Sequence, residues 1–344
     1  MNNHALIDTA TALVADNKGL LAMDESTPTC NKRFAALGIP QDEDFRRTYR
    51  ELLVTTPELS DSISGAILYD ETIRQHTQDG TPMIAVLIAA GIIPGIKVDA
   101  GTHSLAGHPG EFITEGLDGL RERLRDYARL GARFAKWRAV VAVSDDLPSR
   151  GCIEANAHAL ARYAALSQEA GLVPIVEPEV LMDGDHSLAR CREVTEAVQH
   201  AMFAQLHSQR VLLEGLILKP NMVVPGKDSP EYTSGSVTAE MIAEATIDCM
   251  LRTVPAAVPG VAFLSGGQTP EQATERLNAM HVHCGTRLPW AATFSFSRAL
   301  QQPVLDIWRG DVANTQAAQR ALQQRAECNH AARRGAYLPS MEPA

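Results

Sequence analysis

The stretch Gly215-Leu216-Ile217-Leu218-Lys219, followed by Pro220-Asn221-Met222, carries the pattern from which the fold of this chain can be predicted. Its apolar run is typical of a strand buried on both faces. A lysine at the end of such a strand must have its charge solvated, paired or neutralised. Desolvation favours the neutral amine, which is a nucleophile. Considered alone, however, Lys219 is more simply explained as a side chain whose amine reaches water along apolar surface.

The same kind of run recurs along the chain at intervals that suit strands joined by helices. The ends of successive runs lie roughly 30 to 46 residues apart, which leaves room for one helix and two loops. Strands that alternate with helices predict a parallel sheet, and eight such units predict a closed barrel, the α/β (β/α)8 TIM fold. The runs interpreted as strands are Leu20–Asp24, Gly65–Tyr69, Gly95–Asp99, Arg133–Arg138, Leu172–Glu177, Gly215–Lys219, Val261–Ser265 and Ala291–Phe296.

Helical patterns fill the gaps between these runs. Apolar residues recur at helical spacing from Leu117 to Tyr127, from Ile153 to Ala164 and from Leu188 to Leu206. Thr269-Pro270 has the residue types of a helix N-cap followed by the first helical residue.

Helices are also expected at both ends of the chain. An N-terminal helix is predicted over about residues 4–16, and an Ala- and Gln-rich C-terminal helical extension over Val312–Cys328. Residues 334–344 have the character of a short loose tail. No linker, repeat or low-complexity segment divides the chain, so residues 1–344 are predicted to form a single domain.

Composition limits the kind of protein this can be. The 344 residues are 45% hydrophobic, enough for a large core, and carry a formal net charge of −10, which argues against a nucleic-acid surface. No apolar run approaches the roughly 20 residues of a membrane span, and the first residues lack the features of a signal peptide. We therefore expect a cytoplasmic protein that binds neither nucleic acid nor membrane.

The cysteines and histidines do not predict a metal site. Six cysteines lie at positions 30, 152, 191, 249, 284 and 328 without a Cys-x-x-Cys spacing, so reduced, mostly buried thiols are expected. His281-Val282-His283-Cys284 resembles a ligand cluster, but a polar loop between elements explains it better because it lacks a second ligand pair at zinc-site spacing. Neither a dinucleotide-binding nor a Walker glycine motif is present in the sequence.

Reactive side chains gather at the ends of the predicted strands, where βα barrels carry out their chemistry. Asp24 ends the first run, and Lys219 ends the sixth. An ion-pair ring that only closes the barrel is the alternative, but buried charge networks are costly, so a functional site explains the pattern better. Residues two apart on a strand share a face, which aligns Lys97 with Asp99, Lys136 with Arg138, and Glu177 with Glu179.

The seventh run ends in Ser265-Gly266-Gly267, directly before the helix that Thr269-Pro270 opens. A glycine pair after a strand is often only a turn. Backbone N–H groups before a helix can also bind an anion, and barrel loops after strands seven and eight often hold a phosphate. Arg298, after the eighth run, could supply a guanidinium fork, so a phosphorylated substrate is predicted.

Taken together and in this order, these motifs resemble those of class I (Schiff-base) fructose-bisphosphate aldolases, from about residue 4 to residue 338. The Lys-Pro-Asn-Met and Leu-Ser-Gly-Gly-Gln stretches are the most specific. The matching stretches are Met23-Asp24-Glu25-Ser26-Thr27, Gly95-Ile96-Lys97-Val98-Asp99, Phe134-Ala135-Lys136-Trp137-Arg138, Val176-Glu177-Pro178-Glu179, Leu218-Lys219-Pro220-Asn221-Met222, Phe263-Leu264-Ser265-Gly266-Gly267-Gln268 and Thr293-Phe294-Ser295-Phe296-Ser297-Arg298.

The resemblance implies that Lys219 attacks the C2 ketone of fructose 1,6-bisphosphate and forms an imine. Lys136 would stabilise the carbinolamine oxygen, and Glu177, with a pKa raised by burial, would protonate the departing hydroxyl. Asp24, oriented by Lys97, matches the region where the C4 hydroxyl loses its proton. Cleavage would then yield dihydroxyacetone phosphate and glyceraldehyde 3-phosphate. One further match is a supporting hydrogen-bond partner, Glu179.

The resemblance also implies how the substrate is held. No metal and no other cofactor is implied, because the imine serves as the electron sink, and the family likeness implies a homotetramer. The residues that match the C1 phosphate site are Ser265, Gly266, Gly267, Ser297 and Arg298. The candidates for the C6 phosphate end are Ser26, Arg33 and Arg138.

Two departures from the family pattern bear on the reaction. The family often has glycine where this chain has Ser297, at a position whose backbone N–H binds phosphate. The animal enzymes carry a longer tail ending in a tyrosine that takes part in proton transfer to the enamine, whereas Tyr337 is the last tyrosine here. The proton donor and the preference for a bisphosphate over a monophosphate therefore stay open.

Two other functions remain as alternatives. A different Schiff-base barrel, such as a transaldolase or a keto-acid aldolase, would lack paired phosphate sites and would not cleave fructose 1,6-bisphosphate. A non-catalytic barrel acting as a scaffold would have no need for the full set of lysines and carboxylates.

Overall fold

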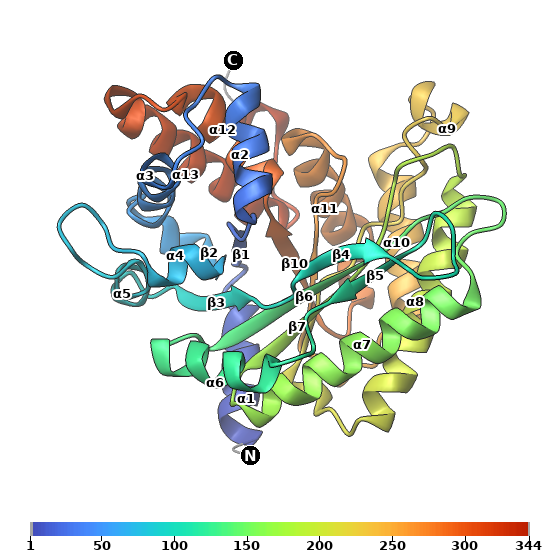
Figure 1. Cartoon of the computed structure of the whole chain (residues 1–344). Helices are drawn as coiled ribbons and strands as arrows, with labels where there is room; N and C mark the ends of the chain where they lie inside the picture. Colours follow the sequence, from blue (N-terminus) through green and yellow to red (C-terminus); the bar gives the residue numbers. More distant parts are fainter. Residues whose placement is uncertain (1–2, 343–344) are drawn as a thin grey trace.

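The computed structural model describes residues 3–342. Within them, eight parallel strands close into a barrel in the order β1-β10-β9-β8-β7-β6-β3-β2. Figure 1 shows the strands at the centre of the molecule with helices around them. This confirms the predicted TIM fold and each of the eight runs predicted as strands. The barrel strands are β1 (Gly19–Ala22), β2 (Ile63–Leu68), β3 (Ile93–Lys97), β6 (Phe134–Val141), β7 (Val173–Val180), β8 (Ile217–Leu218), β9 (Gly260–Phe263) and β10 (Ala291–Phe296).

A second, two-stranded sheet is not predicted by the sequence. β4 (Gly101–Ser104) and β5 (Phe112–Glu115) pair antiparallel in the long connection between β3 and β6. Most of β4 is exposed and polar, so it lacks the apolar run or alternation that marks a buried strand.

Helices surround the barrel and confirm the predicted alternation. Thr269 caps α11 with a full capping box that includes Gln272. Within residues 3–342, no helix is long and apolar enough to cross a bilayer. The α-helices are α1 (Asn3–Leu13), α2 (Thr27–Ala36), α3 (Glu43–Val54), α4 (Asp70–Arg74), α5 (Met83–Ala89), α6 (Leu120–Leu130), α7 (Arg150–Glu169), α8 (Leu188–Ser208), α9 (Pro230–Thr233), α10 (Ala239–Thr253), α11 (Pro270–Cys284), α12 (Arg298–Trp308) and α13 (Thr315–Ala332).

Two local expectations are wrong. α1 ends at Leu13 and not near residue 16, because Asp16 and Asn17 have positive φ angles of 54° and 59°, which a helix cannot continue. The segment from His281 to Cys284 is the last turn of α11 and not a polar loop, and Cys284 is buried there. All six cysteines are free and buried, as expected.

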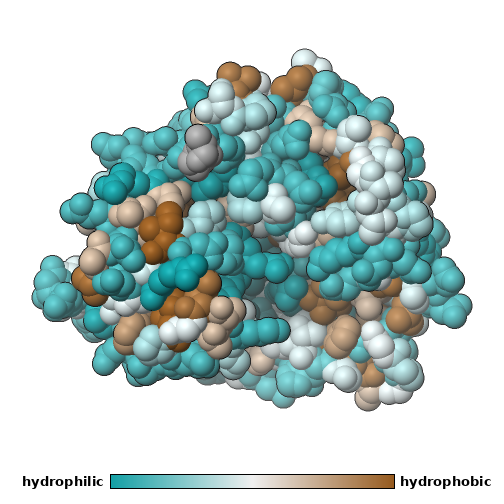
Figure 2. Space-filling view, turned by 90° about the horizontal axis from the view of Figure 1, so that it is seen from above, coloured by the Kyte–Doolittle hydropathy of each residue, from teal (hydrophilic) through white to brown (hydrophobic). Residues whose placement is uncertain are grey.

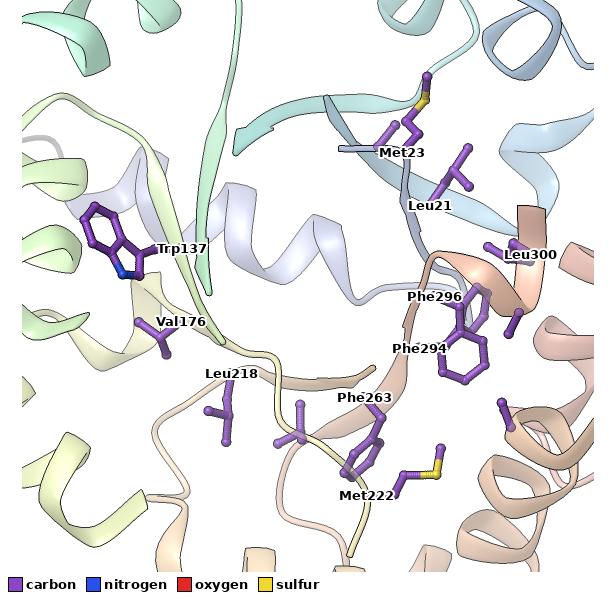
Figure 3. Packing of buried hydrophobic residues seen from close by; sticks show 14 of the residues in the cluster. Leu21, Met23, Trp137, Val176, Leu218, Met222, Phe263, Phe294, Phe296 and Leu300 are labelled. Atoms are coloured by element: carbon purple, nitrogen blue, oxygen red, sulfur yellow. The ribbon is translucent and has the colours of Figure 1, made fainter. Parts of the chain in front are cut away.

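The strands bury their two faces in different cores. Side chains that point into the barrel, such as Leu20 and Ile217, meet Leu6 and Leu13 of α1, which covers the amino end of the barrel. The alternate side chains point outward to the helices, and Leu218, Trp137 and Phe263 belong to this larger cluster (Figure 3). The lysine that follows Leu218 therefore lies on the inward face, at the carboxyl end of the barrel.

The end of the chain is tied to its beginning by a buried arginine. Arg333, directly after α13, is 7% exposed. Its guanidinium donates to the backbone carbonyls of Val14 and Lys18, on either side of the turn between α1 and β1, and to Ala292 of β10. This arrangement secures the C-terminal extension to the amino end of the barrel.

The tail is not loose over residues 334–342. Tyr337 is buried, its backbone N–H donates to Asn278 of α11, and its hydroxyl donates to Glu342 at 2.9 Å. Glu342 also pairs with the buried Arg325 of α13. Residues 343 and 344, the last of the predicted tail, lie outside the described residues.

Candidate active site

A cavity of about 570 Å³ opens at the carboxyl ends of the barrel strands. Seen from above, the molecule is hollowed near its centre, and hydrophilic residues line the hollow (Figure 2). Of the predicted site residues, only Gly267 does not line this cavity. Those that do are Asp24, Ser26, Arg33, Lys97, Lys136, Arg138, Glu177, Glu179, Lys219, Ser265, Gly266, Ser297 and Arg298.

A chain of ion pairs forms the floor of the cavity. Glu177 lies between two lysines, with one oxygen 3.1 Å from the Lys219 ammonium and the other 3.1 Å from that of Lys136. Lys136 also lies 2.6 Å from an oxygen of Asp24. These four side chains are at least nine-tenths buried. Two cations and two carboxylates thus share one enclosed space.

The barrel register places these groups. Lys136 is the third residue of β6 and Glu177 the fifth residue of the neighbouring β7. Lys219 follows β8 directly, and its backbone N–H still donates to Val176 of β7 at 2.8 Å. The strand pairing therefore continues through the lysine itself, which fixes its direction into the barrel.

The electrostatics of this cluster correct one expectation. Burial raises the pKa of Glu177, but Lys136 and Lys219 lower it more, so the pKa falls from 4.5 to about 2. Burial likewise lowers the pKa of Lys136, but Asp24 and Glu177 raise it more, and it lies above its ordinary value. The predicted rise in the pKa of Glu177 is wrong for the free protein, because two cations face the carboxylate.

Lys97 lies at the end of β3 and lines the same cavity, but it is not paired with Asp24. Its ammonium lies 2.5 Å from Asp99, two residues on, and also donates to the Asp99 backbone carbonyl. The expectation that Lys97 orients Asp24 is therefore wrong for the free protein. The two residues of the pair share one strand face, as their spacing predicts.

Glu179 is held at the side of the cavity by Arg138, with which it forms an ion pair. It also lies against the loop after β9, since a Cβ added to Gly266 would be 2.9 Å from a Glu179 oxygen. Glycine at position 266 is what allows the carboxylate and the loop to approach this closely.

The loop after β9 turns sharply at Gly267. Gly267 has a φ of +70°, and a Cβ there would lie 1.7 Å from the sulfur of Met182. Only glycine fits this turn, which places Ser265 and Gly266 at the cavity wall. Arg298 is the first residue of α12, the helix that follows the neighbouring strand β10, and it lines the same wall.

Glu25 is a site residue that the sequence-based prediction did not include. It is buried beside Asp24, and its carboxylate pairs with Arg33 at 2.7 Å and with Arg50 at 2.6 Å. Ser297 donates to it at 2.6 Å. Its position next to Asp24 at a strand end is a usable signal, but its partners come from α2, α3 and the N-cap of α12, which no local pattern connects.

Other unpredicted residues complete the cavity. Most belong to α2 or to the segment around β10 and α12, where the local sequence shows only helix or strand periodicity. Over residues 3–342, no group of three or more His, Cys, Asp or Glu side chains is arranged to hold a metal ion. The additional lining residues include Thr29, Lys32, Leu37, Leu264, Ser295 and Gln302.

Comparison with known proteins agrees with this geometry. The model of the family described as fructose-bisphosphate aldolase class-I matches residues 5–344. A protein of Xanthomonas campestris described as a probable fructose-bisphosphate aldolase class 1 is 56% identical over 338 residues, covering 98% of this chain and 99% of the relative. Fructose-bisphosphate aldolase 6, cytosolic, of Arabidopsis thaliana is 50% identical over 332 residues, covering 96% of this chain and 91% of the relative.

A solved structure extends the likeness to three dimensions. Fructose-bisphosphate aldolase of Plasmodium falciparum, crystallised with TRAP and a small-molecule inhibitor, superposes with a TM-score of 0.94 at 45% identity, covering 97% of this chain and 95% of that one. The match spans the barrel and its helices. With the family model covering nearly the whole sequence, this chain belongs to the class I fructose-bisphosphate aldolase family.

Proposed function

We propose that Lys219 forms the Schiff base through which this enzyme, a lyase, reversibly cleaves fructose 1,6-bisphosphate to dihydroxyacetone phosphate and glyceraldehyde 3-phosphate. The reaction serves glycolysis and gluconeogenesis and follows from the family. The assignment of residues rests above all on one observation: Glu177 lies 3.1 Å from both Lys219 and Lys136 in a buried cluster.

Imine formation begins with a proton transfer. Glu177 is close enough to take a proton from the Lys219 ammonium, which leaves a neutral amine to attack the C2 ketone. With the charge of Lys219 lost in the carbinolamine, one of the cations that lower the Glu177 pKa is gone. The protonated Glu177 then delivers its proton to the C2 hydroxyl, which leaves as water and gives the iminium. Lys136 stabilises the oxygen while its charge develops.

Bond cleavage uses the opposite side of the cluster. The Asp24 carboxylate takes the proton of the C4 hydroxyl, the C3–C4 bond breaks, and its electron pair passes to the iminium at Lys219 to form the enamine. Lys136, 2.6 Å away, holds Asp24 in place. Lys97, held by Asp99, contacts substrate oxygens, and Glu179 supports the substrate from the side.

The two phosphates bind at two rims of the cavity that meet where Ser297 contacts Arg33. Backbone N–H groups of the glycine loop after β9 and the start of α12 suit the C1 phosphate, whereas α2 and Arg138 supply the C6 end. The C1 site comprises Ser265, Gly266, Gly267, Ser297 and Arg298. The C6 site comprises Ser26, Arg33 and Arg138.

The proton donor to the enamine is a group lining the cavity, or water. Tyr337 is occupied elsewhere: its hydroxyl donates to Glu342, and it does not line the cavity. It therefore does not replace the terminal tyrosine of the animal enzymes in this conformation.

We further propose that the chain is one domain, that it acts in the cytoplasm and that it assembles as a homotetramer. Relatives from Arabidopsis thaliana and Pisum sativum described as cytosolic or cytoplasmic support the location, and the barrel that runs through the whole chain supports the single domain. Light scattering would measure the mass of the assembly, and any mass other than four chains would contradict the tetramer.

Borohydride trapping with dihydroxyacetone phosphate tests the proposed function. Reduction of the imine should fix an adduct that peptide mapping assigns to Lys219, and fructose 1,6-bisphosphate should be cleaved. An adduct at another lysine would overturn the assignment of Lys219. Trapping without cleavage of fructose 1,6-bisphosphate would point instead to another Schiff-base reaction.

A further inference from the structure

The Ser297 hydroxyl makes contacts that phosphate binding by the Ser297 backbone does not require. The residue lies between β10 and α12 with a φ of −106°, an angle open to any residue. Its hydroxyl turns toward α2 and donates to Glu25 at 2.6 Å. It also accepts from Arg33 at 3.3 Å. One residue thus touches both rims of the cavity.

The Glu25 carboxylate binds both Ser297 and Arg33. One of its oxygens accepts from Arg33 at 2.7 Å, from Ser297 at 2.6 Å and from Gln301 at 2.8 Å. The other lies 2.6 Å from Arg50. Burial raises the pKa of Glu25, but Arg33 and Arg50 lower it more, well below its usual range. These contacts occupy both oxygens of Glu25, so the carboxylate holds its partners in place.

Arg33 is the partner that faces the substrate. Arg50 is 3% exposed and does not line the cavity, whereas the Arg33 side chain is 19% exposed and does line it. Two of its nitrogens are held from behind, one by Glu25 and the other by Ser297. Two anchoring contacts fix the plane of a guanidinium, so its free N–H groups keep one direction into the cavity.

We propose that the Ser297 hydroxyl is a positioning residue for Arg33, and that it favours sugar substrates carrying a second phosphate over monophosphates. The inference rests on the proposed function, in which Arg33 belongs to the C6 phosphate site. The backbone of Ser297 serves the C1 phosphate, and its hydroxyl sets the guanidinium for the C6 phosphate. A glycine at this position would keep the first role and lose the second.

Steady-state kinetics of Ser297→Ala and Ser297→Thr on two substrates, fructose 1,6-bisphosphate and fructose 1-phosphate, tests this inference. The alanine variant should lower the ratio of kcat/KM for the bisphosphate to that for the monophosphate by about three- to tenfold, the worth of one hydrogen bond. The change should appear in KM and not in kcat, and the threonine variant should restore the wild-type ratio. Ser187→Ala, which removes the N-cap hydroxyl of α8 away from the cavity, should leave the ratio unchanged.

A double-mutant cycle separates this role from a general loss of packing. In an Arg33→Ala background, Ser297→Ala should have little further effect on the ratio, because the residue through which it acts is gone. Equal losses for both substrates, an undiminished effect in the Arg33→Ala background, or a threonine variant that behaves like alanine would overturn the inference. None of these outcomes touches the Lys219 assignment, which depends on the trapping experiment with the wild-type enzyme.

Discussion

Lys136 and Asp24 form a buried ion pair of 2.6 Å across the mouth of the barrel. Two strands, β2 and β3, separate β1 from β6 in the barrel order, so this pair spans the cavity instead of following one edge. It joins the group proposed to remove the C4 proton to the cation proposed to stabilise the carbinolamine oxygen. One ammonium would therefore serve two successive steps, the loss of the oxygen at C2 and the removal of the C4 hydroxyl proton.

Replacing Lys136 by methionine should lower kcat by about 10² to 10³-fold, the loss typical of removing one preorganised charge-stabilising donor. The variant also leaves the carboxylates of Asp24 and Glu177 without the positive charge that pairs with both of them. Stopped-flow measurement of imine formation should show the slowed step. Lys227→Met, which removes an exposed lysine paired with Asp183, should keep the wild-type rate. A Lys136→Met enzyme with wild-type kcat would exclude the proposed role.

Replacing Glu177 by glutamine should change how stability depends on pH. The pKa of Glu177 is lowered from 4.5 to about 2, so its charged form stabilises the fold above pH 4.5, and this contribution is lost as the pH falls toward 2. The contribution is at most about 3 kcal/mol for the coupled cluster. The wild type should therefore lose more stability between pH 5 and 3 than Glu177→Gln, by urea unfolding. Parallel curves would contradict the lowered pKa.

Replacing Gly267 by alanine should raise KM for fructose 1,6-bisphosphate by at least about tenfold, because the loop proposed to bind the C1 phosphate must move to avoid Met182. Gly38→Ala is a matched control, since Gly38 has the same φ of +70° and no atom within 4 Å of an added Cβ. Both variants carry the backbone strain, but only Gly267→Ala carries the clash. If both enzymes had the same KM, the clash would have no bearing on substrate binding.

Replacing Glu342 by glutamine should release the tail. The change leaves the buried Arg325 without its anionic partner. Cys328 lies beneath the tail, 3.9 Å from the Met341 carbonyl, and should react with a thiol reagent about tenfold faster or more once the tail opens. Cys152, buried elsewhere, serves as the internal control. Unchanged labelling of Cys328 would mean that the tail is held by other contacts.

The sequence predicts the barrel well because each strand is short and apolar, and seven of the eight predicted runs finish in, or just before, a reactive polar residue. The ends of the strands also predict the cavity, since parallel strands meet at one end of a barrel and residues two apart share a face. Lys219, Glu177 and Lys136 lie together for that reason. Gly267 is set back from the cavity, yet its positive φ shapes the loop that reaches it.

Partnerships within the site are harder to predict. Lys97 turns to Asp99 and not to Asp24, a choice between two carboxylates that strand position alone does not decide. Glu25 pairs with Arg33 of α2 and Arg50 of α3, and it also binds Gln301 of α12, which lies 276 residues further along the chain. The tail is predicted to be loose, but Tyr337 binds Asn278 and Glu342 pairs with the buried Arg325. Such choices depend on long-range geometry, which local periodicity does not contain.

Pairing of β1 with β10 has a consequence for the synthesis of this protein. Leu20 lies opposite Ser295, so a strand made at the start of translation finds one of its neighbours only after nearly the whole chain has left the ribosome. Arg333 then completes the amino end of the barrel later still. Until that point the nascent chain carries an open sheet with two unpaired edges, which can associate with other chains. Because β10 pairs with both β1 and β9, its insertion closes both edges at once.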